Sequence, residues 1–214
     1  MDDEPISIKC VLLGESGTGK SSLIERFINN TFKKDTLSTL IGSFSSKIVF
    51  YEKENIKIRF DIWDTAGQEK YRSINKIFYQ DAQVTLLVYD ITQEYTYKAI
   101  KDYWFSEVKE NSPEDAIIFL VGNKSDLYEK EVVNEEEARQ YANEINSLYK
   151  LVSAQTGEGI EDIFKMVGER LLTEEFLQKI KEENNANNNR NSIKNIMAEN
   201  TKEIKKKKKC CKIL

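Results

Sequence analysis

The stretch Gly14–Ser21, which reads Gly-Glu-Ser-Gly-Thr-Gly-Lys-Ser, constrains the fold more than any other part of the chain. An apolar run from Ile6 to Leu13 precedes it, and residues 22–28 after it carry apolar side chains at helical spacing. A strand, a G-x-x-x-x-G-K-[ST] loop and a helix in this order predict a phosphate-binding site. Glycines let backbone N–H groups surround phosphates, and the N-terminus of the helix adds positive potential.

Within this loop, Lys20 would reach the outer phosphates and the hydroxyl of Ser21 would ligate Mg²⁺. The expected nucleotide contacts are Ser16, Gly17, Thr18, Gly19, Lys20, Ser21 and Ser22. The alternative is an ordinary glycine-rich turn with a chance lysine, and the motifs that follow in the chain count against it.

Charge is distributed unevenly along the 214 residues, whose net charge is −4. From Lys181 onward the chain has ten Lys or Arg and four Glu, whereas the rest has 22 Lys or Arg and 32 acidic residues. The acidic body argues against a nucleic-acid-binding face, and the basic tail suggests contact with an anionic surface.

Short apolar runs alternate with helical patterns along the chain. After Ile6–Leu13, the predicted strands are Ser46–Tyr51, Ile56–Ile62, Thr85–Tyr89, Ile117–Val121 and Leu151–Val152, and the predicted later helices are Thr96–Asn111, Glu135–Asn146 and Ile160 to about Lys181. Polar residues 30–46 are expected to form a long loop, and residues 52–55 a hairpin turn. This order predicts an α/β fold: a doubly wound, mostly parallel six-stranded sheet with one antiparallel edge strand.

The predicted domain covers residues 6–181, after a short extension (1–5) and before an Asn-rich, disordered tail (182–214). Cys10 lies in the first strand and is an expected core residue, whereas Cys210 and Cys211 are adjacent near the C-terminus. This arrangement indicates no disulfide framework and favours a reducing compartment. We expect no signal peptide and no transmembrane segment.

The motif Asp64-Thr65-Ala66-Gly67-Gln68 directly follows a predicted strand. An acid at this point can hold Mg²⁺ through water. Gly67 has no side chain, so its N–H can approach a γ-phosphate, and Gln68 can orient the attacking water.

Asn123-Lys124-Ser125-Asp126 follows the strand Ile117–Val121. The carboxylate of Asp126 would accept hydrogen bonds from N1 and N2 of guanine, a pair of donors that adenine lacks. Lys124 would cover the base, and Asn123 would tie neighbouring loops together. Taken alone, the motif is also consistent with a solvated turn.

Ser153-Ala154-Gln155 follows the last strand and is too short to be specific by itself. In this position the N–H of Ala154 would donate to guanine O6.

Together with these motifs, the segments Leu87–Thr92, Arg59–Trp63 and Lys70–Ile74 and the serine at position 16 carry a family resemblance. The chain resembles a Ras-superfamily small GTPase, specifically of the Rab family, over residues 6 to about 180 and at its extreme C-terminus. The resemblance implies that Phe32 packs edge-on to the guanine and that Thr39 ligates Mg²⁺ and senses the γ-phosphate. From the residues alone Thr36, Ser38, Thr39 and Ser43 remain candidates for the last role.

The resemblance therefore implies catalytic roles for Gln68, Thr39 and Lys20, and a metal site of Ser21, Thr39 and Asp64. The further nucleotide contacts would be Phe32, Thr39, Gly67, Asn123, Lys124, Asp126, Ser153, Ala154 and Gln155. It also implies that Phe44, Trp63 and Phe78 face effectors, whereas from the residues alone core packing is favoured for these three aromatics.

Three segments depart from the family pattern. In Leu40-Ile41-Gly42 the glycine stands one place later than in the family, so we expect the first switch to close differently or to select unusual effectors. Gln155 replaces the usual lysine, with little expected loss because the Ala154 backbone does the recognition. Residues 78–82, Phe-Tyr-Gln-Asp-Ala, differ at the end of the second switch, which concerns partner choice.

Lys205–Lys209 are five consecutive lysines, followed by Cys210-Cys211-Lys212-Ile213-Leu214. Two lipids and a polybasic patch would meet the requirement for stable membrane anchoring. The double cysteine resembles the Rab pattern in which both residues are geranylgeranylated, although Lys212 is not the aliphatic residue of a C-a-a-X motif. Unmodified cysteines are the alternative.

The resemblance implies a switch that binds GTP or GDP with Mg²⁺, hydrolyses GTP slowly and recruits trafficking effectors when GTP-bound. Its implied partners are a GTPase-activating protein, an exchange factor, a dissociation inhibitor and a prenylation escort protein, and nucleic acid is not expected. Its implied location is the cytoplasmic face of endomembranes, with an inhibitor-bound cytosolic pool. A scaffold with negligible hydrolysis is the alternative, whereas a small-molecule kinase is disfavoured because the Asn123–Asp126 motif has no role in it.

Overall fold

The computed structural model describes residues 4–33, 42–65 and 78–173. The chain divides into two units, Met1–Arg170 and Leu171–Leu214, and the whole sheet belongs to the first. Predictions that fall on residues 34–41, 66–77 and 174–214 lie outside the described residues.

Six strands form one sheet in the order β2-β3-β1-β4-β5-β6. Their bounds are β1 Ile6–Leu13, β2 Ser43–Tyr51, β3 Ile56–Asp64, β4 Val84–Asp90, β5 Ile117–Asn123 and β6 Leu148–Val152. Only the edge strand β2 runs antiparallel, pairing with β3, and the other neighbours in the sheet are parallel. The predicted fold class is confirmed.

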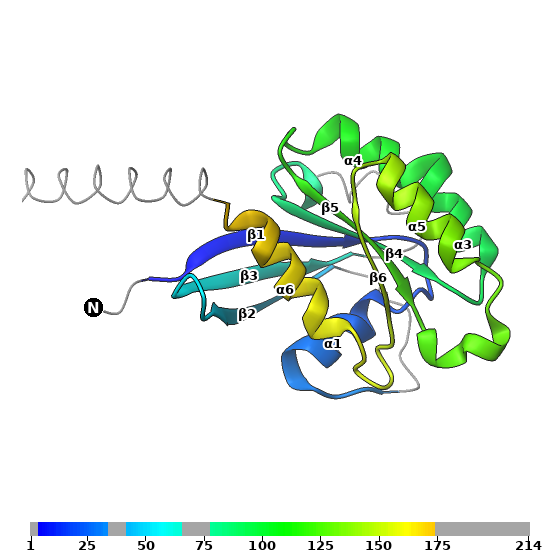
Figure 1. Ribbon diagram of the computed structural model, residues 1–214, viewed down its shortest axis with the longest axis horizontal. Coiled ribbons are helices and arrows are strands. Elements are labelled where there is room, and N and C mark those ends of the chain that lie inside the picture. The colour runs from blue at the N-terminus through cyan, green and yellow to red at the C-terminus, as the bar shows by residue number, and fades with distance from the viewer. Residues whose placement is uncertain (1–3, 34–41, 66–77, 174–214) are drawn as a thin grey trace, which may run out of the picture. The chain divides into compact units, whose positions relative to one another are not determined.

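Helices cover both faces of this sheet (Figure 1). Their bounds are α1 Lys20–Asn29, α3 Glu94–Ala99, η2 Ile100–Trp104, α4 Phe105–Asn111, η3 Ser125–Lys130, α5 Glu135–Glu144 and α6 Ile160–Leu171. Segment η2 is a π-helical turn that joins α3 to α4 in one continuous helix, and η3 is a 3₁₀ helix.

Side-chain alternation along the central strands divides the core into two layers. Val11 and Leu13 of β1 pack in the layer that contains residues of α3, η2, α4 and α5. On the other face, Phe27 of α1 stacks on Phe164 of α6 with ring centroids 3.5 Å apart, and Phe60 of β3 meets Phe164 edge-on. Cys10 is fully buried, as predicted, and burial raises the pKa of its thiol.

Several predicted boundaries were wrong. Strand β2 begins at Ser43 rather than Ser46, because Ser43–Ser45 continue the antiparallel ladder with β3 although one phenylalanine between two serines gave no strand pattern. The helix expected from Thr96 begins at Glu94, and β6 begins at Leu148 rather than Leu151.

Helices α5 and α6 end earlier than predicted, at Glu144 and Leu171. Residues 174–181 of the predicted last helix lie outside the described residues. Among the described residues, no helix is both long enough and apolar enough to cross a membrane.

Candidate nucleotide-binding site

The predicted motifs meet at one edge of the sheet, where the parallel strands β1, β3, β5 and β6 have their carboxyl ends. The phosphate-binding loop follows β1, Asp64 ends β3, and the segments 124–126 and 153–155 follow β5 and β6. Ligands of open α/β sheets bind at this edge, so the topology brings the motifs together as the sequence predicted.

The phosphate-binding loop is shaped by glycine at its junction with α1. Gly19 has φ +89°, which L side chains rarely adopt, and a Cβ there would lie 2.4 Å from Nδ2 of Asn123. The loop therefore requires glycine at this position and leaves a cradle that a side chain would fill. Thr18 is fully buried, and its hydroxyl donates to the carbonyl of Glu15 at 3.0 Å.

Lys20 begins α1 and folds back over the loop. Its ammonium group donates to the carbonyl oxygens of Gly14, at 2.9 Å, and Glu15, at 3.0 Å. Burial lowers the pKa of Lys20 to about 8, an effect that the nearby carboxylates of Asp64 and Glu15 oppose. A buried cation is well suited to receive a polyanion such as a phosphate chain.

The two described members of the predicted metal site are in direct contact. The hydroxyl of Ser21 donates to Oδ2 of Asp64 across 2.5 Å, and Asp64 is buried. Thr65, the next residue, anchors this strand end because its hydroxyl donates to the carbonyl of Leu12 at 2.6 Å. Hydroxyl and carboxylate oxygens are the ligands that Mg²⁺ prefers, so the donor set fits that ion.

Asn123 joins the phosphate-binding loop to the loop after β6. Its Nδ2 donates to the carbonyl of Thr18 at 2.8 Å, and its Oδ1 accepts from the N–H of Ala154 at 3.1 Å. The side chain is buried. The structure thus places Asn123 between the two loops that the sequence expected it to tie together.

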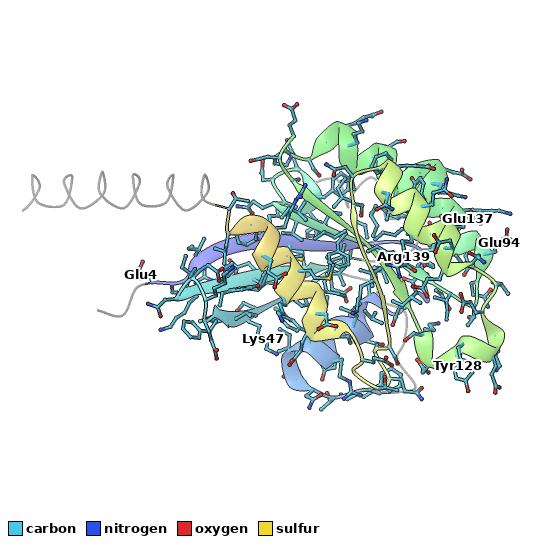
Figure 2. The ribbon with its side chains drawn as sticks, viewed as in Figure 1. Glu4, Lys47, Glu94, Tyr128, Glu137 and Arg139 are labelled. Carbon is cyan, nitrogen blue, oxygen red and sulfur yellow. The ribbon has the colours of Figure 1, made fainter. Side chains whose placement is uncertain are left out.

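The other residues of the predicted base site contact one another. Oδ1 of Asp126 accepts from the hydroxyl of Ser153 at 2.6 Å, and that hydroxyl oxygen accepts from the N–H of Thr156 at 3.0 Å. Lys124 has φ +70°, and its ammonium group pairs with Oδ2 of Asp90 at 2.6 Å. Tyr128, which is labelled in Figure 2, is an exposed residue of η3, the helix that begins directly after Lys124.

Three residues that the sequence did not place in the site support it. Asp90, at the end of β4, holds Lys124. Nε1 of Trp104 in η2 donates to Oε1 of Glu15 at 3.0 Å. Arg26 of α1 donates to backbone carbonyls of the 153–155 loop. These contacts join residues from 34 to 129 positions apart, so no local pattern revealed them.

The three aromatic residues assigned to effectors form one cluster. Trp63 lies between Phe44 and Phe78, with ring centroids 5.1 Å and 5.5 Å away. Phe44 is 53% exposed, whereas Trp63 and Phe78 are half-buried against the core. The cluster therefore has an exposed end and a packed end, and core packing describes only the packed end.

The remaining predicted residues have different outcomes. Phe32 is half-buried beyond the end of α1. Ser43, one of the alternative hydroxyls, lies opposite Asp64 in the β2–β3 ladder. A Cβ at Gly42 would lie 2.9 Å from the carbonyl oxygen of Asp64, so the glycine that departs from the family pattern stands where the backbone approaches this strand end closely. Outside the described residues lie Thr36, Ser38, Thr39, Leu40, Ile41, Gly67, Gln68, residues 70–74, Lys205–Lys209, Cys210 and Cys211.

Comparisons with known proteins agree with this geometry. Residues 9–173 match the Ras family. GTP-binding protein YPT52 of Saccharomyces cerevisiae is 37% identical over 193 residues, which cover 78% of this chain and 82% of that protein. Ras-related protein Rab-4 of Dictyostelium discoideum is 40% identical over 166 residues, 78% of this chain and 80% of that protein.

Ras-related protein RabJ of Dictyostelium discoideum is also 40% identical, over 173 residues that cover 79% of this chain and 66% of that protein. The match to the family spans most of the chain and coincides with the sheet and its loops. The chain therefore belongs to the Ras family and, within it, is a small GTPase of the Rab type.

Proposed function

We propose that the protein is a Rab-type switch that binds GTP or GDP with Mg²⁺, hydrolyses GTP slowly and recruits trafficking effectors while GTP is bound. The contact between Ser21 and Asp64, beside the buried ammonium of Lys20, is the observation that carries the proposal. It brings a cation for phosphate and two oxygen ligands for Mg²⁺ to one point of the sheet edge.

Each described residue has a specific task in this proposal. Lys20 binds the outer phosphates, and Ser21 and Asp64 hold the metal directly and through water. Asp126 accepts from N1 and N2 of guanine, Lys124 covers the base and Ala154 donates to O6. Mg²⁺ supplies charge neutralisation at the phosphates when it is bound.

The tasks of the two switch segments fall on residues outside the described part of the chain: the family resemblance assigns Thr39, and the motif after β3 assigns Gly67 and Gln68. We infer that Thr39 ligates the metal and senses the γ-phosphate, that the N–H of Gly67 contacts the same phosphate and that Gln68 orients the attacking water. The sequence offers no arginine finger, so a GTPase-activating partner would be needed for fast turnover. The exposed end of the Phe44–Trp63–Phe78 cluster supports an effector surface next to these segments.

Regulation would follow the pattern of Rab proteins. An exchange factor would open the site, an escort protein would present the chain for prenylation and a dissociation inhibitor would extract the lipidated GDP form. Residues 6–181 would form the GTP-binding domain, and residues 182–214 a solvated linker that ends in Lys205–Lys209, Cys210 and Cys211. Geranylgeranyl groups and lysines together would hold the protein on the cytoplasmic face of endomembranes.

Single-turnover cleavage of Mg²⁺·GTP by the purified protein tests this function, with Mg²⁺·ATP as the control nucleotide and Gln68→Leu as the control variant. Slow cleavage of GTP that Gln68→Leu abolishes, with ATP untouched, is the expected result. Tight binding of GTP with no cleavage, even in the presence of a GTPase-activating protein, would favour the nucleotide-gated scaffold, for which the displaced Gly42 is the motivating observation.

The anchoring proposal is tested separately, by sedimentation of the prenylated protein with vesicles that contain an anionic lipid. We expect the wild type to sediment and the Cys210→Ser/Cys211→Ser variant to remain in the supernatant. Equal sedimentation of both would contradict lipid anchoring at these cysteines. Replacing all five lysines of Lys205–Lys209 by Gln should weaken binding to anionic vesicles but not to neutral ones.

A further inference from the structure

Arg26, on the last turns of α1, makes four hydrogen bonds from its guanidinium group to backbone and amide oxygens. Nε donates to the carbonyl of Ala154 at 3.0 Å, and Nη2 donates to the carbonyl of Gln155 at 2.6 Å. Nη1 donates to the carbonyl of Asn30 at 2.9 Å and to its side-chain oxygen at 3.2 Å. One side chain therefore holds the loop after β6 against the C-terminal end of α1.

Ala154 is fixed on both sides of its peptide unit. Its N–H donates to Oδ1 of Asn123, and its carbonyl accepts from Arg26. Asn123 in turn donates to the carbonyl of Thr18 in the phosphate-binding loop, which leads directly into α1 and Arg26. These hydrogen bonds close a circuit that runs from Thr18 through Asn123 and Ala154 to Arg26 and back along α1.

The chemistry of the side chain suits this task. A guanidinium presents five N–H donors in a rigid plane, so it can hold several carbonyl oxygens at once in one geometry, and it keeps its charge at all relevant pH values. Among the contacts that the structure describes for Arg26, none is an ion pair with a carboxylate. The hydrogen bonds of Arg26 therefore position the backbone and do not neutralise a carboxylate.

We propose that Arg26 is a positioning residue that holds the peptide unit of Ala154 at the guanine site and thereby couples base recognition to the phosphate-binding helix. In the structure the Ala154 N–H donates to Oδ1 of Asn123, and in the proposal it is shared with guanine O6 when a nucleotide binds. This inference rests on the proposed guanine-nucleotide function. Arg26 touches no substrate itself: it acts through the backbone of the 153–155 loop. It slows nucleotide release because the loop cannot move away from the base without breaking its two bonds to the guanidinium.

Arg26→Ala removes both loop contacts and leaves the Ala154 and Gln155 carbonyls to water. We expect GDP release to become about tenfold faster, with the dissociation constant rising by a similar factor. Arg26→Lys keeps the charge but has one flexible point donor in place of the planar fork, so it should recover only part of the effect. The matched control is Arg139→Ala, since Arg139 is an exposed residue of α5 (Figure 2). It pairs with Glu135 of the same helix.

The decisive measurement compares two ligands, GDP and the diphosphate of 2-aminopurine riboside, which lacks O6 and also the N1–H that Asp126 is proposed to bind. For each ligand the variant is therefore compared with the wild type, so that the weaker binding of the analogue as such cancels. If Arg26 acts through Ala154, Arg26→Ala should weaken GDP by about tenfold and the O6-free analogue by less than about twofold, because the analogue makes no use of the positioned N–H. A merely structural role would weaken both ligands equally. Arg139→Ala should leave both affinities at their wild-type values.

Equal loss for the two ligands, or no loss for GDP, would overturn the proposal. If Arg26→Ala fails to fold, the same comparison of the two ligands with Arg26→Lys tests the proposal. The proposed function is tested separately, by the nucleotide preference of the wild type. A wild type that does not prefer GDP over ADP would contradict that function rather than the role of Arg26.

Discussion

Ser21 and Asp64 lie 43 positions apart in the chain, and the hydroxyl of the first donates to the carboxylate of the second across 2.5 Å. The contact joins the first turn of α1 to the end of β3. Parallel pairing of β1 with β3 places Leu12 opposite Asp64, which brings this strand end to the level of the phosphate-binding loop. The fold itself therefore assembles the two oxygen ligands proposed for Mg²⁺.

Replacing Ser21 by Ala removes one of these ligands while keeping the helix. We expect GDP release in millimolar Mg²⁺ to become about tenfold faster or more, since the metal no longer links the protein to the phosphates. Removal of Mg²⁺ by a chelator should accelerate release from the wild type and change the variant little. A Ser21→Ala protein whose GDP release still responds fully to the chelator would contradict the assignment.

The lowered pKa of Lys20, about 8, predicts a pH dependence of nucleotide binding. Phosphates favour the protonated amine, so the bound state has the higher pKa and binding takes up a proton above about pH 8. The association constant for GDP should be flat below that pH and fall by up to about tenfold per pH unit between about pH 8 and 9. Lys20→Met should lack this slope as well as most of the affinity, whereas Lys109→Met, on the surface of α4, should retain it. A wild-type association constant that stays flat to pH 9 would contradict the assignment.

Two glycines of the phosphate-binding loop should respond differently to the same substitution. Gly17 and Gly19 both have positive φ, +81° and +89°, but a Cβ at Gly17 meets open space whereas one at Gly19 collides with Asn123. Gly17→Ala should therefore lower the free energy of unfolding only by the cost of positive φ for a residue with a Cβ, about 1–2 kcal/mol. Gly19→Ala should lose clearly more, because Asn123 must also give up its bond to Thr18. Thermal unfolding of the nucleotide-free proteins measures the difference, and equal losses would argue against the tight Gly19–Asn123 packing.

The aromatic cluster predicts a separation of stability from partner binding. Phe44 is 53% exposed, so Phe44→Ala should lower the unfolding free energy by less than about 1 kcal/mol. It should nevertheless abolish the binding of GTP-dependent partners in a pull-down with GTP-loaded protein. Phe50→Ala is the matched control, since Phe50 is 50% exposed on the same strand but lies outside the cluster. Identical partner sets for Phe44→Ala and the wild type would exclude Phe44 from the effector surface.

The sequence predicted the fold well where one local signal determined an element. The run Ile6–Leu13 became β1 with unchanged bounds, because five of its eight side chains are apolar and buried, and such a run has few alternatives. Boundaries that depend on distant partners were harder to predict. The serines at the start of β2 belong to the strand only because the hairpin places them beside β3. The π-helical turn at Ile100–Trp104 also left no pattern in the sequence.

The same distinction holds in the site. Motifs of consecutive residues, such as Asn123–Asp126, could be predicted because each carries its chemistry within a few positions. Arg26 could not, since its carbonyl partners lie 128 and 129 positions away and any residue at 154 or 155 supplies a backbone carbonyl. Supporting contacts to the main chain become visible only in three dimensions.

Guanine selectivity tests the central claim most directly, through the variant Asp126→Asn. The carboxylate of Asp126 is proposed to accept from N1 and N2 of guanine, whereas an amide also offers donors and suits xanthine, which carries an oxygen in place of the 2-amino group. We predict that the wild type binds GDP at least about a thousandfold more tightly than xanthosine diphosphate, and that Asp126→Asn reverses the preference. Loss of both nucleotides in equal measure, or retention of the GDP preference, would contradict a guanine site at Asp126.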